Sequence, residues 1–135
     1  MNFFCIIPFL GLSIILTSLC ACFSVSSNSQ FFYEKLPPEI YAQRLRDSSD
    51  YYLIDVRTPG EYRKAHIPDA RNYSFLAFHF GRDVDTLARD KTVFVYCQTC
   101  HRSPYAARIL KRKGFRKVYD LKGGFQKWPA VQKDR

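Results

Sequence analysis

The chain has 135 residues, which is the length of one domain of ordinary size. Its hydrophobic fraction of 47% is sufficient for a packed core and argues against intrinsic disorder. The formal net charge is +9, and no charged side chain occurs before Glu34, so the later part of the chain carries all of it. Such a basic surface attracts nucleic acid, anionic lipid headgroups or a small anionic substrate alike, and the charge alone does not select among them.

The first 22 residues are predicted to be an export signal. Residues 3–19 are almost wholly apolar, like the core of a signal sequence, and small residues follow them. Residues 19–22 (LCAC) resemble a bacterial lipobox, in which Cys22 would be the lipidated residue after cleavage. Ordinary cleavage nearby and an uncleaved anchor stay open as alternatives, because the apolar run approaches the ~20 residues that span a bilayer. We therefore expect an exported protein of the periplasm or cell envelope, with membrane attachment through the N-terminus.

Residues 23–30 are rich in serine and are expected to form a flexible tether to a domain that occupies residues 31–135. The chain contains five cysteines. If the leader is removed and Cys22 is acylated, only Cys97 and Cys100 keep free thiols. No disulfide framework is then expected beyond that one close pair.

Helical and strand patterns alternate along the domain. Residues 92–96 are apolar, β-branched and aromatic, which is typical of a buried strand, and Pro104 suits the start of the helix that follows. The predicted elements, in chain order, are a helix from residue 38 to 45, a strand over 51–56, a short helix from 59, a strand at 70–73, a helix over 75–88 broken near Gly81, the strand 92–96, a helix over 103–113 ended by Gly114, a strand at 118–119 and a turn or helix after 123–124. This alternation predicts an α/β domain with a central, mainly parallel sheet flanked by helices.

Ligands bind beyond the carboxyl ends of the strands in such sheets, so the residues after Tyr96 are the place to look. Cys97 leaves the end of the best predicted strand, and Arg102 follows five positions later, just before a helix begins. Backbone N–H groups of a tight loop and the positive end of a helix both favour the thiolate form of Cys97, which is the nucleophilic form. The same cradle would hold an anionic substrate, with Arg102 as its charged partner. A merely structural cysteine is the alternative, and the helix start after Arg102 disfavours it.

With these segments in place, the sequence resembles the rhodanese-like family over residues 31–129. Residues 53–62 (LIDVRTPGEY) with 66–72 (HIPDARN) look like its first signature, residues 95–103 (VYCQTCHRS) like its active-site loop, and residues 121–129 (LKGGFQKWP) like its closing motif. Each segment alone is weak evidence for the resemblance, but the three segments in this order and spacing are strong evidence. The organisation is similar to that of exported single-domain members such as the phage-shock rhodanese.

The resemblance implies a sulfurtransferase. Cys97 would attack the sulfane sulfur of a small anionic donor such as thiosulfate and become a persulfide, from which a thiol or cyanide acceptor removes the sulfur. No metal or organic cofactor is implied, and nothing in the chain resembles a nucleic-acid-binding module. The residues that would bind the anion and stabilise the persulfide are Gln98, Thr99, Cys100, His101, Arg102 and Ser103.

Two positions depart from the family pattern. Cys100 stands where glycine is usual, which would cost ~1 kcal/mol if that position needs a positive φ, and Ala65 replaces a glycine often found before the signature histidine. Cys100 also places a second thiol near the nucleophile. It is either a redox partner that forms a disulfide with Cys97 or a residue that merely fills the place of the glycine.

Other classes compete for the same residues. A thiol–disulfide oxidoreductase would use Cys97 and Cys100, and a c-type haem protein would use the C-x-x-C-H pattern with His101 as axial ligand. A phosphatase with a related loop would need one more residue between the cysteine and the arginine. A non-catalytic binding module would not need Cys97. Outside the loop, Asp55 and Arg57 are expected to form a structural ion pair.

Overall fold

The computed structural model describes residues 30–128. The predicted export signal with Cys22 and most of the predicted tether therefore lie outside the described residues. The elements, in chain order, are β1 (Phe32–Leu36), α1 (Pro38–Arg46), β2 (Tyr51–Asp55), α2 (Pro59–Lys64), β3 (Arg71–Asn72), the 3-10 helix η1 (Phe75–Ala77), α3 (Phe80–Asp83), the 3-10 helix η2 (Val84–Thr86), β4 (Thr92–Tyr96), α4 (Ser103–Arg112), β5 (Lys117–Leu121) and the 3-10 helix η3 (Phe125–Lys127).

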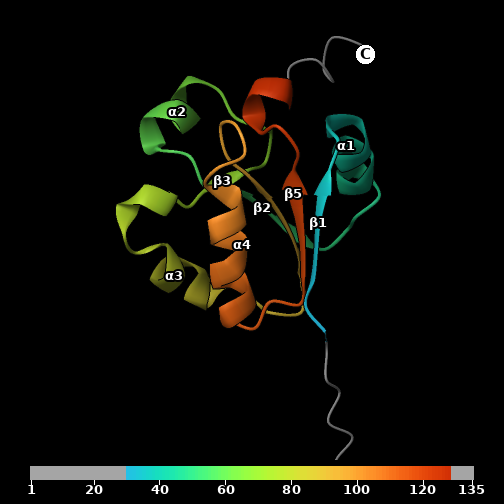
Figure 1. Ribbon diagram of the computed structural model, residues 1–135, viewed down its shortest axis with the longest axis vertical. Helices are drawn as coiled ribbons and strands as arrows, with labels where there is room; N and C mark the ends of the chain where they lie inside the picture. The colour runs from blue at the N-terminus through green and yellow to red at the C-terminus, as the bar shows by residue number, and fades with distance from the viewer. Residues whose placement is uncertain (1–29, 129–135) are drawn as a thin grey trace, which may run out of the picture.

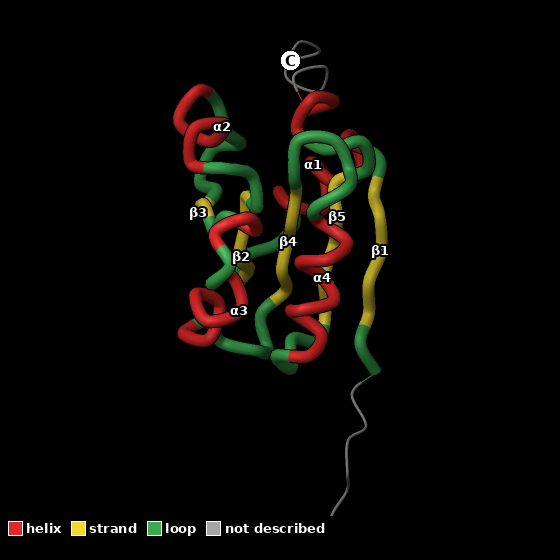
Figure 2. The backbone as a smooth tube through the Cα atoms, turned by 60° about the vertical axis from the view of Figure 1, so that its left-hand side comes forward, coloured by secondary structure: helices red, strands yellow, loops and turns green. Residues whose placement is uncertain are grey.

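The five strands form one sheet in the order β1-β5-β4-β2-β3, and every pairing in it is parallel (Figure 2). The α/β class with a parallel sheet flanked by helices is thus confirmed. All five strands end at the same edge of the sheet, near α2, η3 and the loop after β4 (Figure 1). The place expected to hold the site is therefore an edge shared by several elements.

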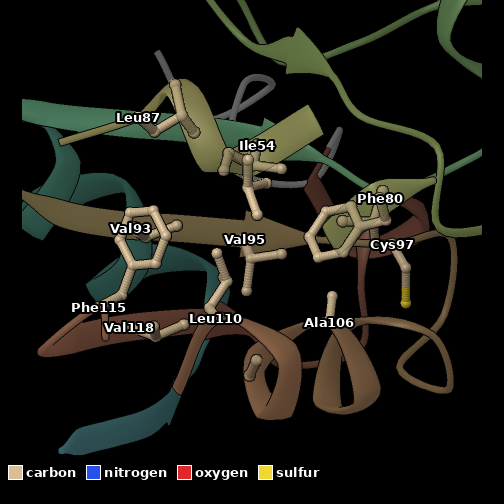
Figure 3. Close-up of a cluster of buried hydrophobic side chains, with 13 residues drawn as sticks. Ile54, Phe80, Leu87, Val93, Val95, Cys97, Ala106, Leu110, Phe115 and Val118 are labelled. Atoms are coloured by element: carbon tan, nitrogen blue, oxygen red, sulfur yellow. The ribbon is translucent and has the colours of Figure 1, made fainter. Parts of the chain in front are cut away.

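The two faces of the sheet bury different side chains, as the alternation along a strand requires. Val93, Val95 and then Cys97 point to the face that α3 and α4 cover, whereas Phe94 and Tyr96 point to the face of α1. Figure 3 shows the first of these clusters, in which Cys97 lies at one end with its sulfur directed away from the apolar side chains. The nucleophile predicted from the sequence is thus continuous with the core of the domain.

One strand was not predicted. Among the described strands, β1 (Phe32–Leu36) lies at an edge of the sheet and pairs with β5 alone. Its sequence, FYEKL, contains two charged residues, and most of its side chains are exposed. An edge strand needs no continuous apolar run, so the signal that identified the central strands is weak here.

The segment over residues 75–88 is helical in three short pieces, and the expected break near Gly81 is present, although not at Gly81 itself. The interruption lies at Phe78 and His79, between η1 and α3, where Phe78 adopts a positive φ of 55°. Gly81 lies inside α3 instead, against Ile109 of α4. None of the helices within residues 30–128 has the length and apolar character of a membrane-spanning helix.

Candidate active site

The loop between β4 and α4 forms the centre of the site. β4 fixes Cys97 at its carboxyl end, and α4 begins at Ser103, so both ends of the loop are held by buried elements. The Cys97 side chain is only 1% exposed, and its Sγ atom lies 3.4 Å from Oγ of the buried Ser103. The structure therefore holds the thiol in one position, next to the first turn of a helix.

The backbone of the loop is available to an anion. Within the described part of the chain, the N–H groups of residues 98–103 donate no hydrogen bond to another residue. Unpaired amides at the start of a helix carry a positive potential and accept negative charge readily. This geometry suits a thiolate or persulfide at Cys97 and the oxygens of a small anion beside it.

Arg102 has a partner that the sequence analysis did not predict. Its two terminal nitrogens each lie 2.8 Å from a carboxylate oxygen of Glu61 in α2, in a two-point ion pair. The Arg102 guanidinium and the hydrogen bonds from Thr58 lower the pKa of Glu61 from 4.5 to about 2. Arg102 was expected to bind the anionic substrate. In the structure its guanidinium is bonded to Glu61 at the solvent side of the loop.

The expected ion pair between Asp55 and Arg57 is present and lies beneath the loop. Arg57 is 2% and Asp55 0% exposed, and Nη2 of Arg57 lies 2.7 Å from the carboxylate. Arg57 Nη1 also donates to Oε1 of Gln98 at 3.0 Å, and the guanidinium lies 3.9 Å from the ring centre of Phe125. This buried pair thus supports the loop from below and fixes the side chain of Gln98.

The outer part of the loop faces solvent. Thr99 Oγ1 lies 2.9 Å from Nδ1 of His101, and the side chains of Cys100 and His101 are exposed. Among residues 30–128 the positive-φ positions outside glycine are Asp69 and Phe78 only, so Cys100 occupies the glycine position without the backbone strain considered above. Both Cys97 and Cys100 carry free thiols, the first buried and the second exposed.

The closing motif forms a roof over the loop. Phe125 N–H donates to the carbonyl of Cys97 at 2.7 Å, and Gln126 N–H donates to that of Gln98 at 3.1 Å. Gly124 has a φ of 69°, and a Cβ atom there would come within 2.6 Å of the Cys97 oxygen. Glycine is therefore required at this position both by its backbone angle and by the close approach of the loop.

A cleft of about 310 Å³ opens beside the loop, between α2 and η3. Arg57, Glu61, Lys64, Gln98 and Phe125 line it, together with Ala65. The cleft is large enough for a small anion, and Lys64 adds positive charge at its exposed side. Within the described residues, no group of three or more His, Cys, Asp or Glu side chains is placed to hold a metal ion.

Residues 38–130 match the model of the rhodanese-like domain family. The thiosulfate sulfurtransferase GlpE of Pseudomonas savastanoi pv. phaseolicola is 35% identical over 105 residues, which cover 76% of this chain and 92% of the relative. The sulfurtransferase of Allochromatium vinosum is 34% identical over 95 residues, or 70% of this chain and 86% of the relative. The uncharacterized protein YqhL of Bacillus subtilis is 42% identical over 76 residues, which cover 56% of this chain and 59% of that protein.

Solved structures agree with these sequence relatives. A rhodanese-related protein from Thermoplasma volcanium has a TM-score of 0.63 and 26% identity, over 73% of this chain and 92% of that one. The rhodanese-like domain of an Anabaena protein has a TM-score of 0.65 at 23% identity, over 72% of this chain and 74% of that one, and this likeness concerns the fold. The match of the family model over most of the described residues, together with these relatives, places this chain in the rhodanese-like domain family.

Proposed function

We propose that this protein is a sulfurtransferase that moves a sulfane sulfur from a small anionic donor such as thiosulfate to a thiol or cyanide acceptor. The observation that carries the proposal is the position of Cys97, whose buried thiol lies at the start of a loop with unpaired backbone amides. Two relatives that are named sulfurtransferases support the same chemistry, because this chain matches them over nearly their whole length.

The reaction would pass through two displacements at sulfur. The Cys97 thiolate attacks the outer sulfur of thiosulfate, the sulfur–sulfur bond of the donor breaks, and sulfite leaves with the bonding electron pair. The acceptor, a thiolate or cyanide, then attacks the outer sulfur of the Cys97 persulfide, and Cys97 leaves as a thiolate. The amides of residues 98–103 would stabilise the negative sulfur in both states.

The competing classes receive less support from the same site. A thiol–disulfide exchange enzyme would bring Cys97 and Cys100 together, yet the first thiol is buried and the second faces solvent. Four residues separate Cys97 from Arg102, one fewer than the phosphatase loops considered above. In the c-type haem reading His101 would be an axial ligand, but here its ring is bonded to Thr99.

The test of the proposed function is the mass of Cys97 after incubation with thiosulfate. A gain of one sulfur on the Cys97 peptide, lost on addition of cyanide, is expected for the wild type. Cys97→Ser should lose both this gain and the release of thiocyanate while its circular dichroism stays unchanged. Sulfur transfer that persists in Cys97→Ser would exclude Cys97 as the nucleophile.

We further propose that the protein is exported to the periplasm or cell envelope and is attached to the membrane through a lipid on Cys22. The support is the apolar, uncharged N-terminal sequence and the lipobox-like residues 19–22. Metabolic labelling with a fatty-acid analogue should mark the wild type and not Cys22→Ala. A cleaved, unlabelled and fully soluble wild type would refute the attachment.

A further inference from the structure

The end of the domain opposite the candidate active site carries a group of basic side chains that the proposed sulfur transfer does not use. Residues 105–119 contain no Asp or Glu. Four exposed cations lie in this segment, where α4 ends and β5 begins, and they are called the basic face here: Lys111, Arg112, Arg116 and Lys117. Figure 1 shows that α4 ends and β1 begins at this end of the domain, whereas α2 and η3 lie at the other end.

The chain enters the sheet beside these cations. The N–H group of Phe32, the first residue of β1, donates to the carbonyl of Arg116 at 2.8 Å, and Phe32 pairs in register with Lys117. Nζ of Lys111 lies 5.5 Å from the ring centre of Phe31, and Nζ of Lys117 lies 5.8 Å from that of Phe32. The basic face therefore borders the point at which the preceding sequence joins the domain.

The charges of the basic face are available to a partner. Among residues 30–128, none of its four members forms a salt bridge, whereas the neighbouring Lys113 is bonded to Asp85 at 2.7 Å. Cations in the last turn of a helix complement the negative end of the helix dipole, which accounts for the two members that lie in α4. Arg116 and Lys117 lie beyond that turn, so the stability of the helix does not explain them.

The sequence before the domain points to a membrane as the partner. The apolar, uncharged residues 3–19 and the lipobox-like residues 19–22 support the attachment proposed above. If a lipid holds Cys22 at a bilayer, residues 23–30 span at most about 30 Å even when fully extended, so Phe31 and the basic face stay near the headgroups. Anionic headgroups attract Lys and Arg within a Debye length, about 8 Å at physiological ionic strength. The tether thus brings the basic face repeatedly within reach of such a surface.

We propose that the basic face binds the anionic headgroups of the membrane that carries the N-terminal segment, and that this contact orients the domain on the bilayer. The inference rests on the membrane attachment proposed above and goes beyond the sulfur transfer. The strands begin at the basic face and end at the candidate active site, so this orientation directs the loop of Cys97 away from the bilayer. A donor and an acceptor then reach the loop from the aqueous side.

The test uses the full chain on vesicles of phosphatidylcholine alone or of phosphatidylcholine and phosphatidylglycerol in equal parts. Lysines are acetylated with acetic anhydride, an uncharged reagent, and the extent is read for each peptide by mass spectrometry. Acetylation of Lys111 and Lys117 should fall at least about fivefold on the anionic vesicles, because the attraction of each cation to such a surface changes binding by about that factor. Lys122, exposed at the opposite edge, should be acetylated equally on both. Sodium chloride at about 1 M should abolish the difference, since the Debye length is then about 3 Å.

Charge reversal separates a face that binds headgroups from one that the tether merely holds nearby. In the double variant Arg116→Glu, Lys117→Glu the protection of Lys111 on anionic vesicles should be lost. Arg63→Glu is the matched control, because Arg63 is exposed in α2 at the other end of the domain, and it should keep the protection. Circular dichroism checks that each variant is folded. If the double variant is not, the salt dependence of the wild type decides the question.

The proposal is overturned if Lys111 and Lys117 are acetylated equally on the two kinds of vesicle, or if their protection persists at high salt or in the double variant. An oligonucleotide that protects these lysines on neutral vesicles, with no protection by anionic lipid, would overturn it as well and assign the basic face to nucleic acid. A chain that leaves neutral vesicles but stays on anionic ones would refute the attachment through Cys22 and leave headgroup binding by the basic face standing. None of these outcomes depends on sulfur transfer at Cys97.

Discussion

The loop after β4 contacts two ion pairs, each between an arginine and a carboxylate. The pair Asp55–Arg57 lies beneath the loop and is called the wall here, and the pair Glu61–Arg102 lies at its solvent side and is called the rim. In the wall, Arg57 and Asp55 are almost wholly excluded from solvent, whereas in the rim the side chains of Arg102 and Glu61 are 20% and 31% exposed. A buried pair that loses one member leaves an uncompensated charge in the core, while an exposed pair can exchange its partner for water or for another anion. The wall therefore suits support of the loop, and the rim suits exchange with a ligand.

The largest effect is expected in the wall. Asp55→Asn leaves the Arg57 charge buried without its counterion and should lower the free energy of unfolding by about 3–5 kcal/mol. Urea denaturation followed by circular dichroism measures this loss. Glu61→Gln is the matched change in the rim and should cost less than about 1 kcal/mol. Equal losses of unfolding free energy in the two variants would show that burial does not make the Asp55–Arg57 pair more important for stability than the Glu61–Arg102 pair.

The second prediction concerns ligand exchange at the rim. Arg102→Ala should lower kcat/KM for thiosulfate about ten- to a hundredfold, because charge-assisted hydrogen bonds contribute about 1.5–3 kcal/mol. Its melting temperature should change little. Arg46→Ala, at the far end of α1 from the loop, removes an exposed arginine that does not face the site and serves as the control. If thiosulfate kinetics in Arg102→Ala match the wild type, the guanidinium serves only Glu61.

A smaller effect is expected from acid. The pKa of Glu61 in the folded protein is about 2 and its ordinary value is 4.5, so the rim pair stabilises the fold fully above pH 4.5. That contribution is lost as the pH falls through about 2. The difference in the free energy of unfolding between wild type and Glu61→Gln should therefore shrink from pH 6 to pH 2. A difference that stays constant over this range would place its origin outside the ionisation of Glu61.

The smallest effect is expected at Cys100. Its thiol faces solvent while that of Cys97 is buried, so attack on the inner sulfur of a Cys97 persulfide, with release of sulfide, would require the loop to rearrange. We therefore expect Cys100→Gly and wild type to sustain equal turnover without a reductant. Inactivation of the wild type alone, with rescue by a thiol and a Cys97–Cys100 disulfide in its mass spectrum, would instead establish Cys100 as a redox gate.

Much of the fold could be predicted because its central strands are short runs of apolar, β-branched and aromatic residues, which are recognisable in the sequence itself. Residues 92–96 form β4 as expected, and the helix predicted from Ser103 ends at Arg112. β1 was missed because an edge strand with charged residues has no such local signal. The break between η1 and α3 lies near Gly81 as predicted, but its exact position could not be predicted, because glycine permits a break without requiring one and the positive φ falls at Phe78.

The loop of the candidate site and the Asp55–Arg57 pair beneath it were predicted from the sequence, but the bond between Glu61 and Arg102 was not. Glu61 belongs to a recognised motif, yet its bond to Arg102 joins residues 41 positions apart, and nothing local to either one specifies the other. The burial of Asp120, which lies in β5 and is 1% exposed, was not predicted, because a single acidic residue in a short strand is usually exposed and only the sheet order places β5 inside the sheet. Contacts of this kind follow from topology rather than from local pattern.

The contacts of Gly124 and Phe125 with the loop after β4 have a consequence for biosynthesis. The ribosome makes Cys97 and its neighbours well before the segment whose amides bind the carbonyls of Cys97 and Gln98. A chain that ends before Gly124 carries every residue of the loop and still lacks the contacts that give the loop its shape. The loop around Cys97 can therefore take its described shape only after η3 has been made and has docked on it.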